Sequence, residues 1–140
     1  FCVTANRSSA NSALMVIRGE WNNTEVASIY ISSGTDTTNK DDGQIRFYTS
    51  PNSGTGIQNR MTIDSNGHVL PGANDTYDLG SSSLRWRDIY TGDLNLSNEG
   101  KTNDVDGSWG DYTIQEGESD LFLINNRSGK KFKFNLTEVS

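Results

Sequence analysis

Apolar and polar residues alternate with a period of two through most of the N-terminal half of the chain. This period is typical of β-strands, because successive side chains of a strand point to opposite faces of a sheet. The pattern predicts strands at Ala13–Arg18, Val26–Ser32, Gly43–Ser50 and Arg60–Asp64, with Val69–Gly72 closing the module. Asn66-Gly67 predicts a hairpin turn between the last two segments, since both residue types accept a positive φ.

The C-terminal half predicts shorter strands. Two pieces at Ile89–Thr91 and Asp93–Leu96 precede a stretch, residues 98–110, that its glycines and scattered acids mark as a loop. Three further strands are predicted at Tyr112–Gln115, Leu121–Ile124 and Lys131–Leu136. Leu121–Ile124 is apolar at every position, which is typical of a strand buried on both faces. No segment has a sustained 3.6-residue apolar repeat, so the predicted fold is mostly β.

The composition indicates that this β-protein has few hydrophobic residues with which to form a core of its own. Only 32% of the 140 residues are hydrophobic, whereas 59 are Ser, Thr, Asn or Gly. Many of the 13 aromatic residues lie within periodic runs, which argues against disorder. We therefore expect an elongated molecule of short antiparallel strands and hairpins whose core is completed by trimerisation. The longest apolar runs have four to five residues, far short of the roughly 20 of a membrane helix, so membrane insertion is not expected.

Three modules follow from these patterns. Residues 1–72 form an N-terminal β module, which we expect to be a fragment of a longer chain because it opens with Phe rather than Met. Residues 73–100 form a second, short β module, and residues 101–140 combine an acidic loop with a C-terminal β-hairpin. The single cysteine excludes an internal disulfide framework.

Charge argues against a nucleic-acid partner, because the formal net charge is −6. It is also unevenly distributed: residues 88–120 hold nine acids and one base, and the following hairpin holds four bases. Two solvated faces are the simplest interpretation. The alternative is that the acidic and basic regions order neighbouring chains or modules.

The titratable residues do not predict catalysis. His68 adjoins the Asn-Gly turn, which indicates a surface position rather than a catalytic triad. Cys2 has no neighbour in sequence that would activate it as a nucleophile. Residues 103–107 resemble part of a calcium loop, but the first and twelfth positions fall on Thr102 and Thr113, which favours an acidic turn over a weak ion site. No catalytic, cofactor-binding or metal-binding residues are predicted.

Aromatic residues in polar loops are the remaining candidates for binding. Trp21 and Trp109 lie among turn-forming residues, where sugar stacking and packing between chains are equally compatible with the sequence. Tyr112 is grouped with them as a candidate surface contact for glycans. Trp86 lies in an alternating stretch and is expected to be in the core.

Three stretches resemble modules of tailed-bacteriophage tail fibres and related appendage proteins. Residues 58–69, QNRMTIDSNGHV, are similar to an R-M-x-I-D-S-x-G-x-V element, and residues 78–90, DLGSSSLRWRDIY, to a D-L-G-S-S-x-x-R-W-x-x-I-Y module. The stretch from Tyr112 to Phe132 resembles a terminal hairpin module of phage structural proteins. Together they cover about a third of the chain. The chaperone domain that often ends such fibres is not apparent.

The resemblance implies a non-catalytic, homotrimeric, extracellular appendage of a virion that attaches to a host surface. Its implied partners are its own copies, other virion proteins and a host glycan or receptor. One alternative is a tailspike module that degrades polysaccharide, which needs a cleft lined by carboxylates. Another is a subunit of a non-viral surface filament or adhesin.

Overall fold

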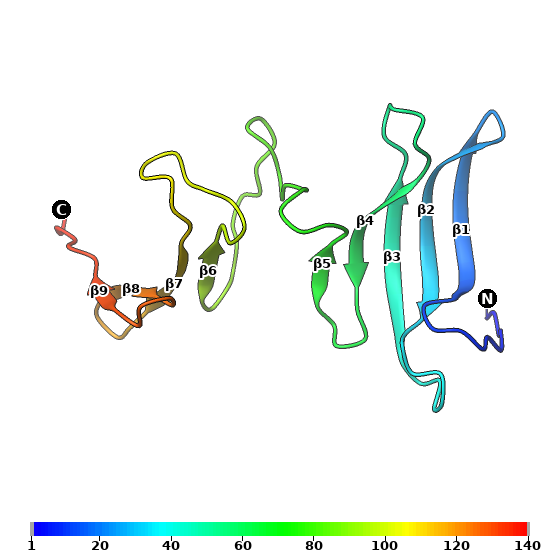
Figure 1. The fold of residues 1–140 in the computed structure, drawn as a ribbon, viewed down its shortest axis with the longest axis horizontal. Helices are drawn as coiled ribbons and strands as arrows, with labels where there is room; N and C mark the ends of the chain where they lie inside the picture. Colours follow the sequence, from blue (N-terminus) through cyan, green and yellow to red (C-terminus); the bar gives the residue numbers. More distant parts are fainter. Residues whose placement is uncertain (1, 140) are drawn as a thin grey trace. The chain divides into compact units, whose positions relative to one another are not determined.

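The structure is a computed structural model that describes residues 2–139. Within that range it contains nine β-strands, arranged in two antiparallel sheets, and no helix (Figure 1). The predicted mostly-β fold is therefore confirmed. The chain divides into two compact units, residues 1–83 and 84–140, each with one sheet.

The first unit contains a five-stranded sheet, here called sheet A, whose strands lie side by side in sequence order (Figure 1). Its strands are β1 (Ala13–Trp21), β2 (Thr24–Ser33), β3 (Gly43–Thr49), β4 (Gln58–Ile63) and β5 (Val69–Pro71). Every segment that alternation predicted in this half is present. The first two strands are longer than predicted, because Asn22 and Asn23 both adopt a positive φ and form a two-residue hairpin turn between them.

The predicted hairpin at Asn66-Gly67 is confirmed, and a carboxylate organises it. Gly67 has a φ of 83° and donates its N–H to the carbonyl oxygen of Asp64 at 3.0 Å. Asp64 Oδ1 accepts the backbone N–H groups of Asn66 and His68, each at 2.9 Å. Asn66 is not among the residues with positive φ, so only the glycine of the pair uses that conformation.

One face of sheet A is apolar across its whole width, and we call it the apolar face. Antiparallel pairing places residues opposite one another in rows that run across the strands. Two rows on this face are apolar on all five strands. The first row is Met15, Ile31, Ile45, Ile63 and Val69, and the second is Ile17, Ile29, Phe47, Met61 and Pro71.

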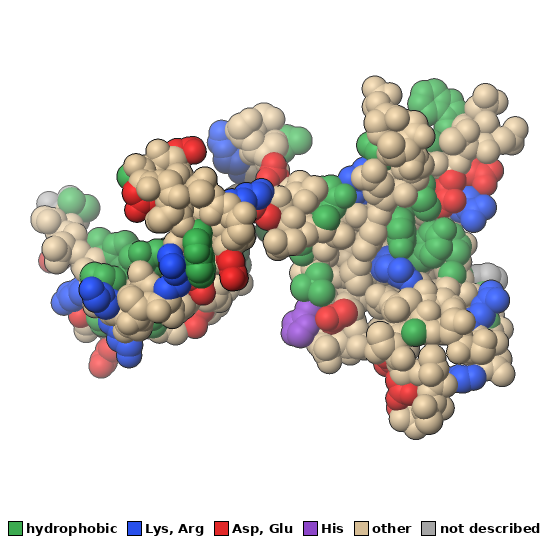
Figure 2. Space-filling model, in the orientation of Figure 1, with side chains coloured by type: hydrophobic (Ala, Val, Ile, Leu, Met, Phe, Trp, Pro, Cys, Tyr) green, Lys and Arg blue, Asp and Glu red, His purple; other side chains and the backbone are tan. Residues whose placement is uncertain are grey.

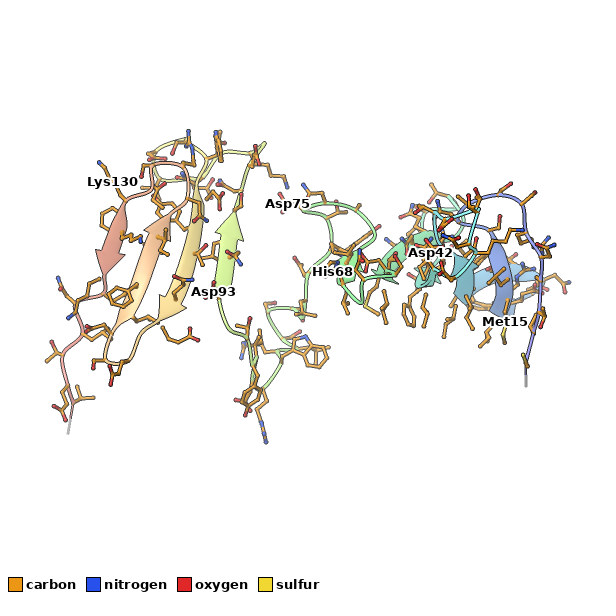
Figure 3. The ribbon with its side chains drawn as sticks, turned by 90° about the horizontal axis from the view of Figure 1, so that it is seen from below. Met15, Asp42, His68, Asp75, Asp93 and Lys130 are labelled. Atoms are coloured by element: carbon orange, nitrogen blue, oxygen red, sulfur yellow. The ribbon has the colours of Figure 1, made fainter. Side chains whose placement is uncertain are left out.

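The opposite face of sheet A is polar and aromatic, and its own chain covers part of it. Arg46 Nη2 donates to the carbonyl oxygen of Asn11 at 2.8 Å, and Gln44 Nε2 donates to Asn11 Oδ1. The rings of Tyr30 and Tyr48 lie 4.7 Å apart at their centroids. Figure 3 shows both sides of the sheet: largely hydrocarbon side chains project on the side of Met15, whereas Asp42 lies on the other side.

The second unit contains a four-stranded sheet, here called sheet B, also in sequence order. Its strands are β6 (Leu94–Ser97), β7 (Asp111–Glu116), β8 (Leu121–Asn125) and β9 (Lys131–Lys133). One row across all four is again apolar: Leu94, Ile114, Leu123 and Phe132.

Three predictions for this unit need correction. Ile89–Thr91 is not a strand, because nothing in the described chain pairs with it. The last strand ends at Lys133 rather than Leu136, although Phe134 still donates its N–H to the carbonyl oxygen of Leu121 at 3.0 Å. Leu121–Ile124 forms a strand as predicted, but its residues are only half-buried, since neither face has a covering layer in the unit itself.

The absence of a closed core is the main result of the fold. Among residues 2–139 no hydrophobic side chain is buried, and the buried polar residues are Ser28, Ser32 and Thr113. Each sheet is a single layer with an apolar face, whereas stable domains are normally built from at least two packed layers. The strands are therefore defined by pairing and turns, and neither unit supplies a second layer over its own apolar face.

Candidate functional site

The largest candidate site is the apolar face of sheet A. Residues of its two rows are half-buried or exposed, with Ile17 at 52% and Val69 at 64% exposure. A shallow apolar hollow on the same sheet is lined in part by Ile17, Ala27, Ile29 and Phe47. Single exposed apolar residues are normal in soluble proteins, but a contiguous patch of this kind marks an interaction surface. Alternation predicted that such a face exists, whereas its extent depends on strand register.

The motif at residues 78–90 is a second exposed apolar region. Trp86 is 64% exposed, so the prediction that it lies in the core is wrong. Leu79, Leu84, Ile89 and Tyr90 are also exposed, and residues 78–90 contain no strand. The alternation of apolar and polar residues indicated that these side chains suit burial. It does not indicate whether residues of this chain or of another chain cover them.

Trp21 lies at the end of β1, beside the two-asparagine turn, and is 79% exposed. On the same hairpin, Arg18 Nε lies 3.1 Å from Glu25 Oε2, and Arg18 Nη1 lies 3.6 Å from Glu20 Oε1. An open indole ring among asparagine and charged side chains is suited to stacking on a sugar ring. Its assignment as a glycan contact stays a prediction.

Trp109 and Tyr112 have protein partners in the second unit. The Arg127 guanidinium lies 3.8 Å from the centroid of the Trp109 ring, and Arg127 Nη1 donates to the Trp109 carbonyl oxygen at 2.6 Å. Tyr112 is half-buried in β7, and its hydroxyl accepts a hydrogen bond from Asn125 Nδ2 at 2.9 Å. Arg127 covers one face of the Trp109 ring. The two residues lie 18 positions apart in the chain, and no feature of the sequence predicted their contact. Trp21 belongs to the first unit, whereas Trp109 and Tyr112 belong to the second.

His68 is at the surface, as predicted, with its Nδ1 3.1 Å from Asp64 Oδ2 (Figure 2, purple). The His68 backbone N–H lowers the pKa of the Asp64 carboxyl, and the other contacts of Asp64 with the turn add to this. The Asp64–His68 pair therefore helps to hold the β4–β5 turn. Cys2 is free and exposed.

The loop that resembled a calcium site directs its oxygen atoms at its own backbone. Asn103 Oδ1 accepts the N–H groups of Val105 and Asp106, and Asn103 Nδ2 donates to Asp106 Oδ1 at 2.7 Å. Asp106 Oδ1 also accepts the backbone N–H of Ser108 at 2.9 Å and its hydroxyl at 2.7 Å. The side-chain oxygen atoms of Asn103 and Asp106 thus stabilise the turn of their own loop. No group of three or more possible metal ligands occurs among the residues that the structure describes.

Acid should loosen this loop between about pH 4 and pH 2. Hydrogen bonds from the Ser108 N–H, the Ser108 hydroxyl and the Asn103 amide lower the pKa of Asp106 from 3.8 to about 2. Because the folded pKa lies below the unfolded one, the stabilisation is present above pH 4 and is lost as pH falls through 2. NMR titration of the Ser108 amide should follow the change. Asp106→Asn, which keeps an oxygen acceptor, should remove this step; an unchanged profile would contradict the assignment.

Residues 2–139 contain no helix of the length and apolarity needed to cross a membrane. Comparison with protein-family models, curated proteins and solved structures returned no match.

Proposed function

We propose that this chain is a structural and adhesive subunit of a virion appendage, a tail fibre or spike, that acts without catalysis. The observation that supports the proposal is that each unit has a single sheet with an apolar face and no second layer of its own over that face. A subunit that completes its fold in an assembly has such faces, whereas an independent monomeric enzyme normally closes its own core. The resemblance of residues 58–69 and 78–90 to phage fibre modules supplies the biological class.

The adhesive part of the proposal depends on several copies of the chain presenting the same contact residues. Trp21 and the polar turns of each chain offer weak contacts to a surface glycan. Three identical chains would present three such sites, so that individually weak contacts combine through avidity. The partners are then copies of the chain, other virion proteins and a glycan or receptor on the host, outside the cell.

A glycan-degrading tailspike is the second candidate. Glycoside hydrolysis needs a carboxylic acid and a carboxylate placed on either side of the sugar. The two carboxylates beside Trp21, those of Glu20 and Glu25, are both ion-paired with Arg18, which favours a binding role for this hairpin over hydrolysis. A reducing-end assay on bacterial surface polysaccharides separates the two: release of reducing ends would favour the tailspike.

Binding to a bacterial glycan array tests the adhesive function, with Trp21→Ala as the variant. Loss of one aromatic stacking contact is expected to cost about 1 kcal/mol per site, or about fivefold in affinity, and more in a trimer. Trp86→Ala is the matched control, since Trp86 is another exposed tryptophan and is not a predicted glycan contact. No binding by the wild type, or equal loss in both variants, would contradict the role of Trp21.

A further inference from the structure

We infer that the turn end of the β8–β9 hairpin binds an acidic polysaccharide, a glycan with carboxylate or phosphate groups repeated along its length. The surface consists of Arg127, Lys130 and Lys131, and we call it the basic hairpin end. The inference rests on the proposed function and deepens it by naming the chemical class of the glycan.

Positive charge is concentrated at this end of the hairpin, although the chain as a whole is acidic. Four of the 12 Lys and Arg residues lie at positions 127–133, whereas the formal net charge is −6. All three side chains of the basic hairpin end are exposed, and Lys130 lies at the turn between β8 and β9 (Figure 3). Ions screen charges beyond about 8 Å at physiological salt, so acids farther away in the chain weaken this local positive potential only slightly.

The three cations are not used in ion pairs within the described part of the chain, where no carboxylate lies at ion-pairing distance from them. The fourth base of the hairpin, Lys133, is paired, because its Nζ lies 2.7 Å from Asp120 Oδ1. Asp111 also contacts the turn, but its Oδ1 accepts a hydrogen bond from Asn126 Nδ2 at 2.9 Å. The basic hairpin end is therefore available to an anion from outside the chain.

Arg127 is held in place for anion binding. Its guanidinium carbon lies 3.8 Å from the centroid of the Trp109 ring, and its Nη1 donates to the Trp109 carbonyl oxygen at 2.6 Å. A guanidinium group has five N–H donors, and this carbonyl is the one acceptor that the described residues provide for it. The remaining donors can bind a carboxylate or phosphate through two parallel hydrogen bonds, at little cost in side-chain entropy because the ring already fixes the group.

An extended polymer suits this surface better than a small anion or a folded protein. A single exposed ion pair is weak, so one small anion gains little, whereas a polymer of repeated anions can contact all three cations at once. Lysine is depleted in the core of protein interfaces, which makes an acidic protein a poorer fit. Nucleic acid is also a polymer of anions, but the negative net charge of the chain opposes binding to its dense phosphate backbone.

Three polymers test the inference, with binding to the full 140-residue chain measured by isothermal titration calorimetry. Polygalacturonate carries carboxylates, poly(glycerol phosphate) carries phosphates, and fully methyl-esterified polygalacturonate has the first backbone without its charges. We expect at least one charged polymer to bind about tenfold more tightly than the neutral ester, and added salt should weaken this binding. The charged polymer that binds also identifies the anionic group.

Substitutions at the basic hairpin end should weaken binding of the charged polymer. Lys130→Gln and Lys131→Gln should each weaken it about threefold, because each removes one ion pair. Arg127→Lys keeps the charge but loses the two parallel hydrogen bonds, and it should also weaken binding about threefold. All three positions are exposed, and circular dichroism of each variant checks that the strands are retained.

Two matched controls separate this surface from a general effect of charge. Lys40→Gln removes one positive charge from the first unit, where Lys40 Nζ donates to Asn6 Oδ1 at 2.7 Å. The double variant Asp120→Asn, Lys133→Gln removes the ion pair of the same hairpin with no change in net charge. Both should bind the charged polymer as tightly as the wild type does.

Equal affinity for the charged and neutral polymers, or no binding to any of the three, would overturn the inference. Equal losses in Lys40→Gln and Lys131→Gln would do the same, and tighter binding of single-stranded DNA would assign the surface to nucleic acid instead. The adhesive function is tested separately. If the wild type binds neutral glycans on the array but neither charged polymer, the adhesive function stands and the acidic class of glycan is wrong.

Discussion

Replacement of Gly72 by alanine is expected to lower the free energy of unfolding by about 2 kcal/mol, a typical value for overpacking a close contact. Gly72 follows β5, and its N–H donates to the Arg60 carbonyl oxygen at 2.9 Å. A Cβ there would overlap the carbonyl group of Asn59, which is backbone and cannot rotate away. To relieve the overlap, β5 must move off β4 and weaken this hydrogen bond.

The close approach at Gly72 has a structural origin in β4. The pairing of β3 with β4 shifts register between Phe47 and Tyr48, which leaves Arg60 as an extra residue in the strand. Such a bulge bends the strand and alters which backbone atoms face its other neighbour. Glycine at position 72 is therefore required by space, and it is not among the glycines with positive φ.

Thermal unfolding at one protein concentration is the measurement, because assembly makes the midpoint depend on concentration. For a unit of this size 2 kcal/mol corresponds to a fall of roughly 8–16 °C. Gly43→Ala is the control: its Cβ would lie 3.4 Å from the Ser32 carbonyl oxygen, an ordinary contact at the start of β3. It should be neutral or slightly stabilising. Equal midpoints for both variants would contradict the steric argument.

Alternation was sufficient to predict the five strands of sheet A, each of which pairs with its neighbour in sequence. The same pattern failed at Ile89–Thr91, where no partner strand exists among residues 2–139. It also failed for Trp86, since periodicity identifies residues that suit burial but not the chain that covers them. The hydrophobic pattern therefore predicted strands better than it predicted packing between layers.

The candidate surfaces could be identified only once the registers of the strands were known from the structure. That Val69 and Ile17 share a face with Phe47 follows from pairings across four strand boundaries, all of them on one side of the bulge in β4. A one-residue slip at any boundary would move a strand's apolar residues to the other face. Alternation alone does not specify these registers. The Asn22-Asn23 turn, in contrast, had an available signal, since asparagine tolerates positive φ better than most residues.

Replacement of Asn125 by alanine is the second substitution with a large expected effect, a loss of about 2 kcal/mol in the second unit. Asn125 ends β8, and its Oδ1 accepts the backbone N–H groups of Arg127 and Ser128 at 3.1 and 3.0 Å. Its Nδ2 donates to the Tyr112 hydroxyl on the adjacent strand at 2.9 Å. One side chain thus holds both the β8–β9 turn and the β7–β8 pair, and alanine removes all three hydrogen bonds.

Asn125→Asp separates these two contributions. Aspartate keeps the oxygen that accepts the two turn N–H groups, and the Tyr112 hydroxyl can donate to the carboxylate in place of accepting. Asn125→Asp should therefore retain most of the stability that Asn125→Ala loses, and amide hydrogen exchange at Arg127 and Ser128 should be fast in the alanine variant alone. If both variants exchange these amides equally fast, the side-chain amide donor rather than the turn acceptor stabilises the hairpin. If neither does, the turn is held by its backbone hydrogen bonds, from Asn125 to the Lys130 carbonyl oxygen and from Gly129 to the Asn125 carbonyl oxygen, each 2.8 Å.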